Sequence, residues 1–152
     1  MARIVVAEDE EELRGFVARA LAMDGHEVTA AADGAEAFDL IAQHHGSFDL
    51  LLADIRMPVM DGIALALATA RDYPQITILL MTGYADQRER AHGLDALIHD
   101  VISKPFTLSQ IRSTVNDALR ADDTRRMTDE PNLSVVRLLS SVYQKSRSRR
   151  SM

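Results

Sequence analysis

The 152-residue chain contains no cysteine, so it can form no disulfide and no thiolate metal site, and it has no thiol nucleophile. It also contains no hydrophobic run long enough to cross a membrane. The apolar stretch after Met1 is too short for a signal peptide, so we expect a cytoplasmic protein without membrane contacts. No G-x-x-x-x-G-K-[ST] loop occurs, which argues against a nucleotide-driven switch.

Length and charge indicate one compact domain followed by a tail. At 47% hydrophobic residues, the chain can bury a core of domain size. Residues 1–121 carry 19 acidic and 10 basic side chains, whereas residues 122–152 carry 4 acidic and 7 basic ones. We therefore predict an acidic globular body at 1–121 and a basic, partly disordered tail at 122–152.

Strand-like and helix-like patterns alternate five times along the body. We predict strands at 3–7, 26–31, 48–55, 76–82 and 99–103, and helices at 11–23, 34–45, 62–71, 86–94 and from 107 onward. The predicted buried faces of the first two helices comprise Leu13, Phe16, Val17, Ala20 and Leu21, and then Phe38, Ile41 and Ala42. Five such units predict an α/β fold, with a doubly wound parallel sheet covered by helices on both faces.

Polar side chains stand where these strands end. Asp54 closes the most apolar strand, although an unpaired buried carboxylate is costly. Glu8 and Asp9 follow the first strand, Thr82 ends the fourth, and Lys104 follows the fifth. Because the carboxyl ends of parallel strands meet at one edge of the sheet, we expect these five side chains to share a crevice.

The chemistry of that crevice favours phosphoryl transfer. Three neighbouring carboxylates repel one another unless a cation neutralises them, and Mg²⁺ prefers such oxygen ligands. Lys104 supplies a positive charge suited to a phosphoryl group, and Thr82 supplies a neutral hydrogen-bond donor. We therefore interpret Asp54 as a nucleophile that forms an acyl phosphate beside Mg²⁺.

Four motifs carry a resemblance to a known family: Glu8-Asp9, "LLLADIRMPVMDG", "LLMTGYAD" and "VISKPF". Over residues 1–121 the chain resembles the response regulator receiver domain of two-component signalling. That resemblance implies a CheY-like fold with strand order 2-1-3-4-5. It also implies that the bond between Lys104 and Pro105 is often cis.

The resemblance assigns a role to each strand-end residue. It implies that Asp54 is the phosphoacceptor and that Glu8 and Asp9 are metal-site acids. The backbone carbonyl of Arg56 would be a further Mg²⁺ ligand. Thr82 and Lys104 would contact the phosphoryl oxygens, so the set of residues that carry out the transfer is Asp54, Lys104 and Thr82.

One position departs from the family. Receiver domains usually have an aromatic residue on the fifth strand, three residues before the lysine, and this chain has Val101 there. Tyr84, two residues after Thr82, either replaces it as a mobile aromatic or is simply an exposed loop residue. We expect the output surface around residues 84–104 and on the last helix.

The resemblance also implies partners. It implies that a histidine kinase or a histidine phosphotransfer protein donates the phosphoryl group, and that the output is binding to another protein. We expect no enzymatic activity beyond hydrolysis of the chain's own acyl phosphate, and a monomer or weak homodimer. A phosphatase of the haloacid dehalogenase type would need a second aspartate where Arg56 stands, so that alternative is weak.

Among single-domain receivers the chain is most similar to the CpdR group, through its "AEDE" start, its "MDGIALA" segment and its "SKP" without the strand-five aromatic. That similarity implies control of a ClpXP-type protease. The alternative is a transcriptional regulator that acts through its tail or through a missing effector domain. Residues 133–143 fit a short amphipathic helix, and the tail is either a solvated terminus, a docking segment or, least favoured, a nucleic-acid contact.

Overall fold

The computed structural model describes residues 1–128, and the side chains of these residues except at positions 85, 86 and 125–128. Strands and helices alternate strictly in the order β1 (Arg3–Ala7), α1 (Glu11–Met23), β2 (Glu27–Ala31), α2 (Gly34–Gln43), β3 (Leu50–Asp54), α3 (Gly62–Asp72), β4 (Thr77–Thr82), α4 (Ala85–His92), β5 (Asp100–Ser103) and α5 (Leu108–Thr128). Wherever the sequence predicted both ends of a strand or helix, each observed end lies within two residues of the predicted end.

All five strands pair in parallel in one sheet, in the order β2-β1-β3-β4-β5. The doubly wound α/β fold and its strand order are therefore confirmed. The register places Asp54 opposite Met81 on β4, and Thr82 opposite Ser103 on β5. Consequently, the carboxyl ends of β3, β4 and β5 lie at the same edge of the sheet.

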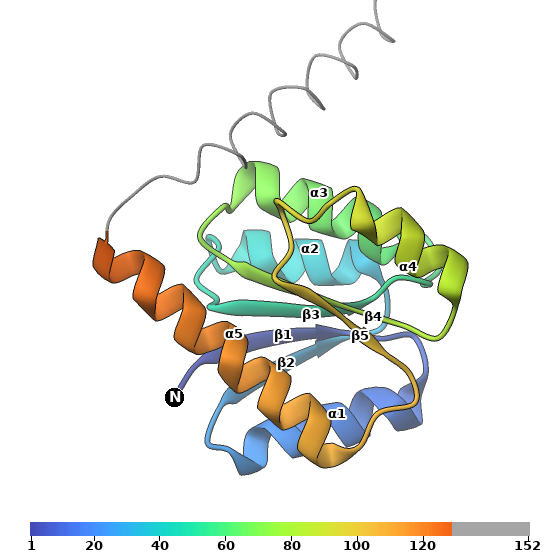
Figure 1. Ribbon diagram of the computed structural model, residues 1–152, viewed down its shortest axis with the longest axis horizontal. Coiled ribbons are helices and arrows are strands. Elements are labelled where there is room, and N and C mark those ends of the chain that lie inside the picture. The colour runs from blue at the N-terminus through green and yellow to red at the C-terminus, as the bar shows by residue number, and fades with distance from the viewer. Residues whose placement is uncertain (129–152) are drawn as a thin grey trace, which may run out of the picture.

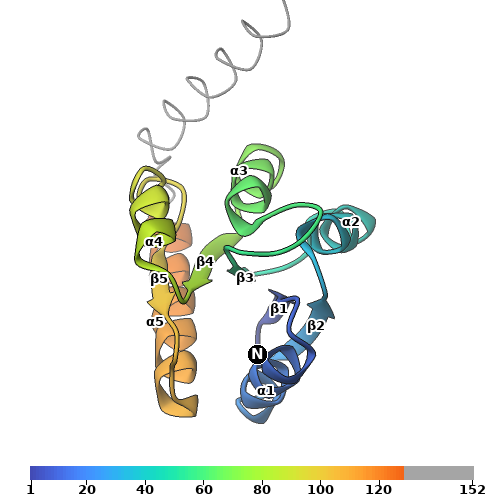
Figure 2. The ribbon, with the colours of Figure 1, turned by 90° about the vertical axis from the view of Figure 1, so that its right-hand side faces the viewer.

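Helices cover both faces of the sheet (Figure 1). Helices α1 and α5 pack on one face, while α2, α3 and α4 lie on the other, and Figure 2 shows these two layers from the end of the molecule. Each layer encloses its own apolar core, one around Leu21 and Ile111 and the other around Ile41 and Leu65. Every residue of β3 and β4 is buried, which explains their almost uninterrupted apolar sequences.

Two predictions about helix faces are wrong. Phe16 is 37% exposed, and Ala42 is exposed as well. Each follows or precedes a fully buried residue, Val17 in α1 and Ile41 in α2, and therefore lies about 100° around the helix axis from it. The buried stripe of each helix is thus narrower than the apolar pattern indicated.

Helix α5 begins where the sequence predicted. The hydroxyl of Thr107 accepts a hydrogen bond from the Gln110 N–H at 3.1 Å, and the Gln110 side chain accepts one from the Thr107 N–H at 2.7 Å. The helix then continues to Thr128, so the predicted boundary at residue 121 falls inside it. The helix predicted at 133–143 lies outside the described residues.

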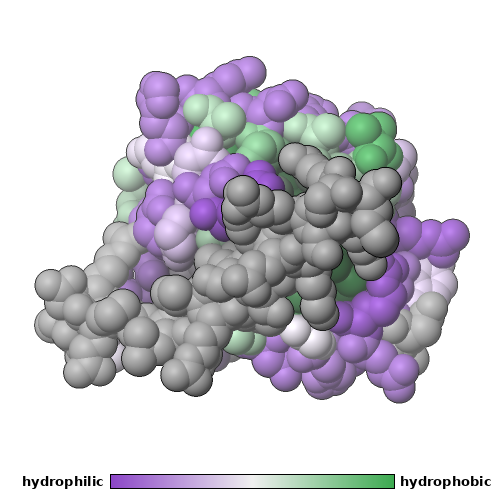
Figure 3. Space-filling model, turned by 90° about the horizontal axis from the view of Figure 1, so that it is seen from above, coloured by the Kyte–Doolittle hydropathy of each residue, from purple (hydrophilic) through white to green (hydrophobic). Residues whose placement is uncertain are grey.

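Where the described residues are visible from above, their surface is mostly hydrophilic, with small apolar patches between the polar side chains (Figure 3). Exposed large hydrophobic side chains in the described part of the chain are few: Met1, Phe16, Met23, Val59 and Tyr84. Within residues 1–128, no helix is both long enough and apolar enough to cross a membrane.

Candidate functional site

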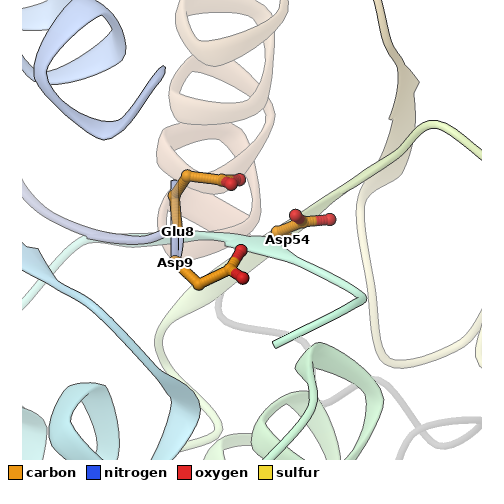
Figure 4. Close-up of side chains that lie close together, drawn as sticks. All are labelled: Glu8, Asp9 and Asp54. Atoms are coloured by element: carbon orange, nitrogen blue, oxygen red, sulfur yellow. The ribbon is translucent and has the colours of Figure 1, made fainter. Parts of the chain in front are cut away.

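An acidic cleft opens at the carboxyl edge of the sheet. It is lined by eight residues: Glu8, Asp9, Glu10, Asp54, Arg56, Gly83, Tyr84 and Lys104. Glu8 and Asp9 follow β1, and Figure 4 shows their carboxylates close to that of Asp54 at the end of β3. One carboxylate oxygen from each of these three residues lies within 4.8 Å of the others. The structure therefore brings the three predicted acids together.

Asp54 is held in place by the buried strand β3 and by the close approach of α3. Its strand is buried along its whole length, and Asp54 itself is only 6% exposed. A side chain at Gly62 would place its Cβ 2.2 Å from the Asp54 carbonyl oxygen, so α3 can start this close to Asp54 only with glycine there. The Gly62 N–H donates to the Ile55 carbonyl at 2.8 Å, and Asp61 caps α3 by accepting from the Ala64 N–H at 2.8 Å.

Lys104 connects two of the acids. Its Nζ donates to Asp54 Oδ2 at 2.8 Å and to Glu8 Oε2 at 3.1 Å. Burial lowers the pKa of Lys104, but its hydrogen bonds to and attraction by Asp54 and Glu8 outweigh burial, so the pKa is raised and the side chain is a cation. The Lys104–Pro105 peptide bond is cis.

One lysine does not neutralise three carboxylates. Burial and repulsion from Asp54 raise the pKa of Glu8 to about 7, although Lys104 acts in the opposite direction. Glu8 is 1% exposed, so water relieves little of this repulsion. Hard oxygen ligands with excess negative charge are what a divalent cation such as Mg²⁺ requires, and the residues present therefore fit a metal site.

Thr82 lies at the end of β4 but does not line the cleft. Its hydroxyl lies 3.0 Å from Gln87 Oε1 and 3.2 Å from the Tyr84 carbonyl oxygen, and it accepts a hydrogen bond from the Tyr84 N–H at 3.1 Å. The hydroxyl therefore contacts the beginning of α4 rather than the carboxylates. Sequence reasoning missed Gln87, because nothing in a polar helix indicates which of its side chains reaches back to a neighbouring strand.

The two positions predicted to matter for switching lie in different surroundings. Tyr84 is 51% exposed at the mouth of the cleft, and its ring centroid is 5.1 Å from the guanidinium carbon of Arg56. The N–H of Arg56 lies 3.4 Å from Asp54 Oδ1. Val101 is half-buried and packs against the core beneath α2, α3 and α4. Tyr84 is therefore part of the cleft, whereas Val101 packs against the core.

Sequence relatives agree with this geometry. A family model described as "Response regulator receiver domain" matches residues 4–116. Response regulator MprA from Mycobacterium sp. strain KMS is 32% identical over 136 residues, which cover 90% of this chain and 58% of MprA. Sensor kinase CckA from Brucella abortus strain 2308 is 34% identical over 123 residues, which cover 80% of this chain and 13% of CckA. The chain thus spans little more than half of MprA.

Solved structures show the same fold. A CheY-like response regulator receiver domain protein from Methanospirillum hungatei JF-1 is similar with a TM-score of 0.75 and 25% identity, over 82% of this chain and 98% of that one. NtrX from Brucella abortus is similar with a TM-score of 0.77 and 25% identity, over 84% of this chain and 29% of NtrX. The family match, the strand order and the acidic cleft lead to one conclusion: this chain belongs to the response regulator receiver domain family of two-component signalling.

Proposed function

We propose that Asp54 accepts a phosphoryl group from a phosphohistidine of a histidine kinase or histidine phosphotransfer protein, and that the modified chain changes its binding to a downstream protein. The observation that carries this proposal is the Lys104 Nζ held 2.8 Å from Asp54 Oδ2 in a cleft lined by three further acidic residues. The flexible lysine side chain can pair with the free carboxylate and, after transfer, with the phosphoryl group attached to it.

The reaction is a simple displacement. An Asp54 carboxylate oxygen forms a bond to phosphorus while the P–N bond of the phosphohistidine breaks, and the released imidazole nitrogen takes a proton from solvent. Phosphoryl transfer needs mainly positioning and charge stabilisation. The buried strand β3 supplies the positioning, and Lys104 stabilises the oxygens of the transferred group.

Mg²⁺ belongs to this proposal. Glu8, Asp9 and Asp54 would hold it, together with the backbone carbonyl of Arg56, and the bound ion would neutralise negative charge on the phosphoryl oxygens. The Thr82 hydroxyl would donate a hydrogen bond to one of those oxygens. We expect no other enzymatic activity than hydrolysis of the acyl phosphate, and a monomer or weak homodimer.

The output we propose is protein binding through the surface formed by residues 84–104 and α5, with CpdR-like control of a ClpXP-type protease as the specific candidate. A second candidate is a transcriptional regulator that acts through the tail or through a segment outside this chain. It is favoured by the lengths of MprA and NtrX, of which the chain covers 58% and 29%. Sequence-selective DNA binding at physiological salt in a gel-shift assay would favour this second candidate.

Phosphoramidate tests the phosphoacceptor directly, because its P–N bond resembles that of a phosphohistidine. With Mg²⁺, we expect intact-protein mass spectrometry to show one added phosphoryl group, and none after chelation with EDTA. Asp54→Asn should abolish the modification, whereas Asp39→Asn, a matched change of an exposed aspartate on α2, should leave it unchanged. If Asp54→Asn still gained one phosphoryl group per molecule, as the wild type does, the assignment of Asp54 would be overturned.

A further inference from the structure

Helix α4 is attached to the rest of the domain mainly by polar contacts. Among its described side chains, Ala91 alone is buried, and no side chain caps its N-terminus. From the side chains of residues 87–92, three polar contacts reach neighbouring elements: Gln87 to Thr82, Arg88 to the Ser103 hydroxyl, and Arg90 to Asp61 at 3.6 Å. An element held in this way can shift its position without disrupting a packed core.

The contact from Gln87 differs from the other two because it ends on Thr82. The Thr82 hydroxyl has one proton, and Gln87 Oε1 at 3.0 Å is the nearer of its two acceptors. Thr82 follows Met81, which pairs with Asp54 across β3 and β4. A phosphoryl group on Asp54 would therefore be close to the strand end that carries this hydroxyl.

The same proton cannot serve both partners. If the Thr82 hydroxyl donates to a phosphoryl oxygen, its hydrogen bond to Gln87 is lost, since a hydroxyl donates only once. A charged phosphoryl oxygen is the stronger acceptor, because hydrogen bonds to ionised groups are about twice as strong as neutral ones. Val101 cannot report this change by forming a hydrogen bond, because its side chain is apolar and packs into the core.

We propose that Gln87 is the positioning residue that couples α4 to the state of Asp54. In the unphosphorylated domain, the Gln87–Thr82 hydrogen bond holds the beginning of α4 against β4. Phosphorylation withdraws the hydroxyl proton from Gln87 and frees this end of the helix. The inference rests on the proposed function, and it names the residue through which that function reaches the surface at residues 84–104.

The Gln87–Thr82 hydrogen bond and the binding of a phosphoryl mimic to Asp54 must oppose each other equally, and this makes the proposal measurable. An interaction that exists only in the unphosphorylated state opposes the phosphorylated one, so its removal must strengthen binding of a phosphoryl mimic. A typical neutral hydrogen bond corresponds to an effect of about five-fold. Gln87→Met keeps the length and volume of the side chain and removes the acceptor oxygen.

The experiment compares full-length variants by titration with beryllofluoride and Mg²⁺, followed by NMR, and by amide hydrogen exchange of residues 85–92. We expect Gln87→Met to bind beryllofluoride about five-fold more tightly than the wild type. Without beryllofluoride, its α4 amides should already exchange as fast as those of the loaded wild type. Arg90→Met is the matched control, because it removes another attachment of α4 without touching Thr82, and its affinity should stay within about two-fold.

A double-mutant cycle separates this role from general loosening of the helix. In a Thr82→Val background, Gln87→Met should leave beryllofluoride affinity unchanged, because no hydroxyl remains to be shared. The role of Gln87 would be overturned by an unchanged affinity of Gln87→Met in the native background, or by a five-fold gain that persists with Thr82→Val. Either result would leave the proposed function intact. Failure of the wild type to bind beryllofluoride would overturn the proposed function and this inference together.

Discussion

The two halves of the cleft are built differently. On the β3–α3 side, all five strand residues are buried and α3 buries Leu65, Ala66, Thr69 and Ala70. On the α4–β5 side, Ile102 is the one buried residue of its strand, and α4 buries Ala91 among the side chains described. Asp54, the proposed phosphoacceptor, thus stands on a tightly packed element, whereas α4 stands on a loosely packed one. Rigidity is useful for positioning, and low local stability is useful for switching.

The largest effect is expected when one glycine is substituted on each side of the cleft, Gly62 at the start of α3 and Gly93 at the end of α4. Gly62→Ala should lower the free energy of unfolding by about 3 kcal/mol, because its Cβ would lie 2.2 Å from the backbone oxygen of Asp54 and the buried strand cannot yield. Gly93→Ala should be neutral or stabilise by up to about 1 kcal/mol, because its φ is −66° and the nearest atom is 3.7 Å away. Urea unfolding measures both. Equal losses would show that the two sides are packed alike.

A second test uses the carboxyl group of Glu8, which is buried beside Asp54. Because the folded pKa of Glu8 is about 7, above its ordinary value of 4.5, its contribution to stability is present below pH 4.5 and is lost as the pH rises through 7. In EDTA at pH 8, Glu8→Gln should therefore be more stable than the wild type by roughly 3 kcal/mol.

The same pair of proteins supplies the control. The advantage of Glu8→Gln should disappear at about pH 3, well below the ordinary pKa of 4.5, where Glu8 is protonated in both the folded and unfolded chains. Chemical denaturation across this pH range measures the difference. A constant difference at every pH would mean that the burial of Glu8 among carboxylates does not oppose folding.

A smaller effect is expected in the loop after β3. Val59 has a φ of +68° and is 85% exposed, and a β-branched residue rarely adopts this backbone conformation. Val59→Gly should relieve that strain and raise the free energy of unfolding by about 1 kcal/mol, while Val59→Ala should gain less. A loss of stability with glycine would show that the loop contains no strain.

The smallest effect is expected on the loosely packed side. Arg90→Met removes an ion pair between side chains that are 57% and 36% exposed, so the free energy of unfolding should change by less than about 0.5 kcal/mol. Thermal unfolding in low and high salt measures it. A loss comparable with that of Gly62→Ala would mean that α4 is anchored far more firmly than its burial indicates.

Much of this architecture could be predicted from local patterns. The two most apolar segments became β3 and β4, and the acids at the ends of the first and third strands meet in the cleft. The patterns failed where a residue lies at the edge of a buried stripe, as Phe16 does, since exposure there depends on the neighbouring element.

The alternation of strands and helices along the chain was by itself enough to place Asp54, Glu8, Asp9 and Lys104 at one edge of the sheet, because parallel strands joined by helices have all their carboxyl ends there. Tertiary structure alone decided the direction of each hydrogen bond in the cleft. Lys104 is shared between Asp54 and Glu8, and the Thr82 hydroxyl contacts Gln87 of the next helix. Such choices depend on rotamers and on the packing of elements distant in sequence, and no local pattern of residues encodes them.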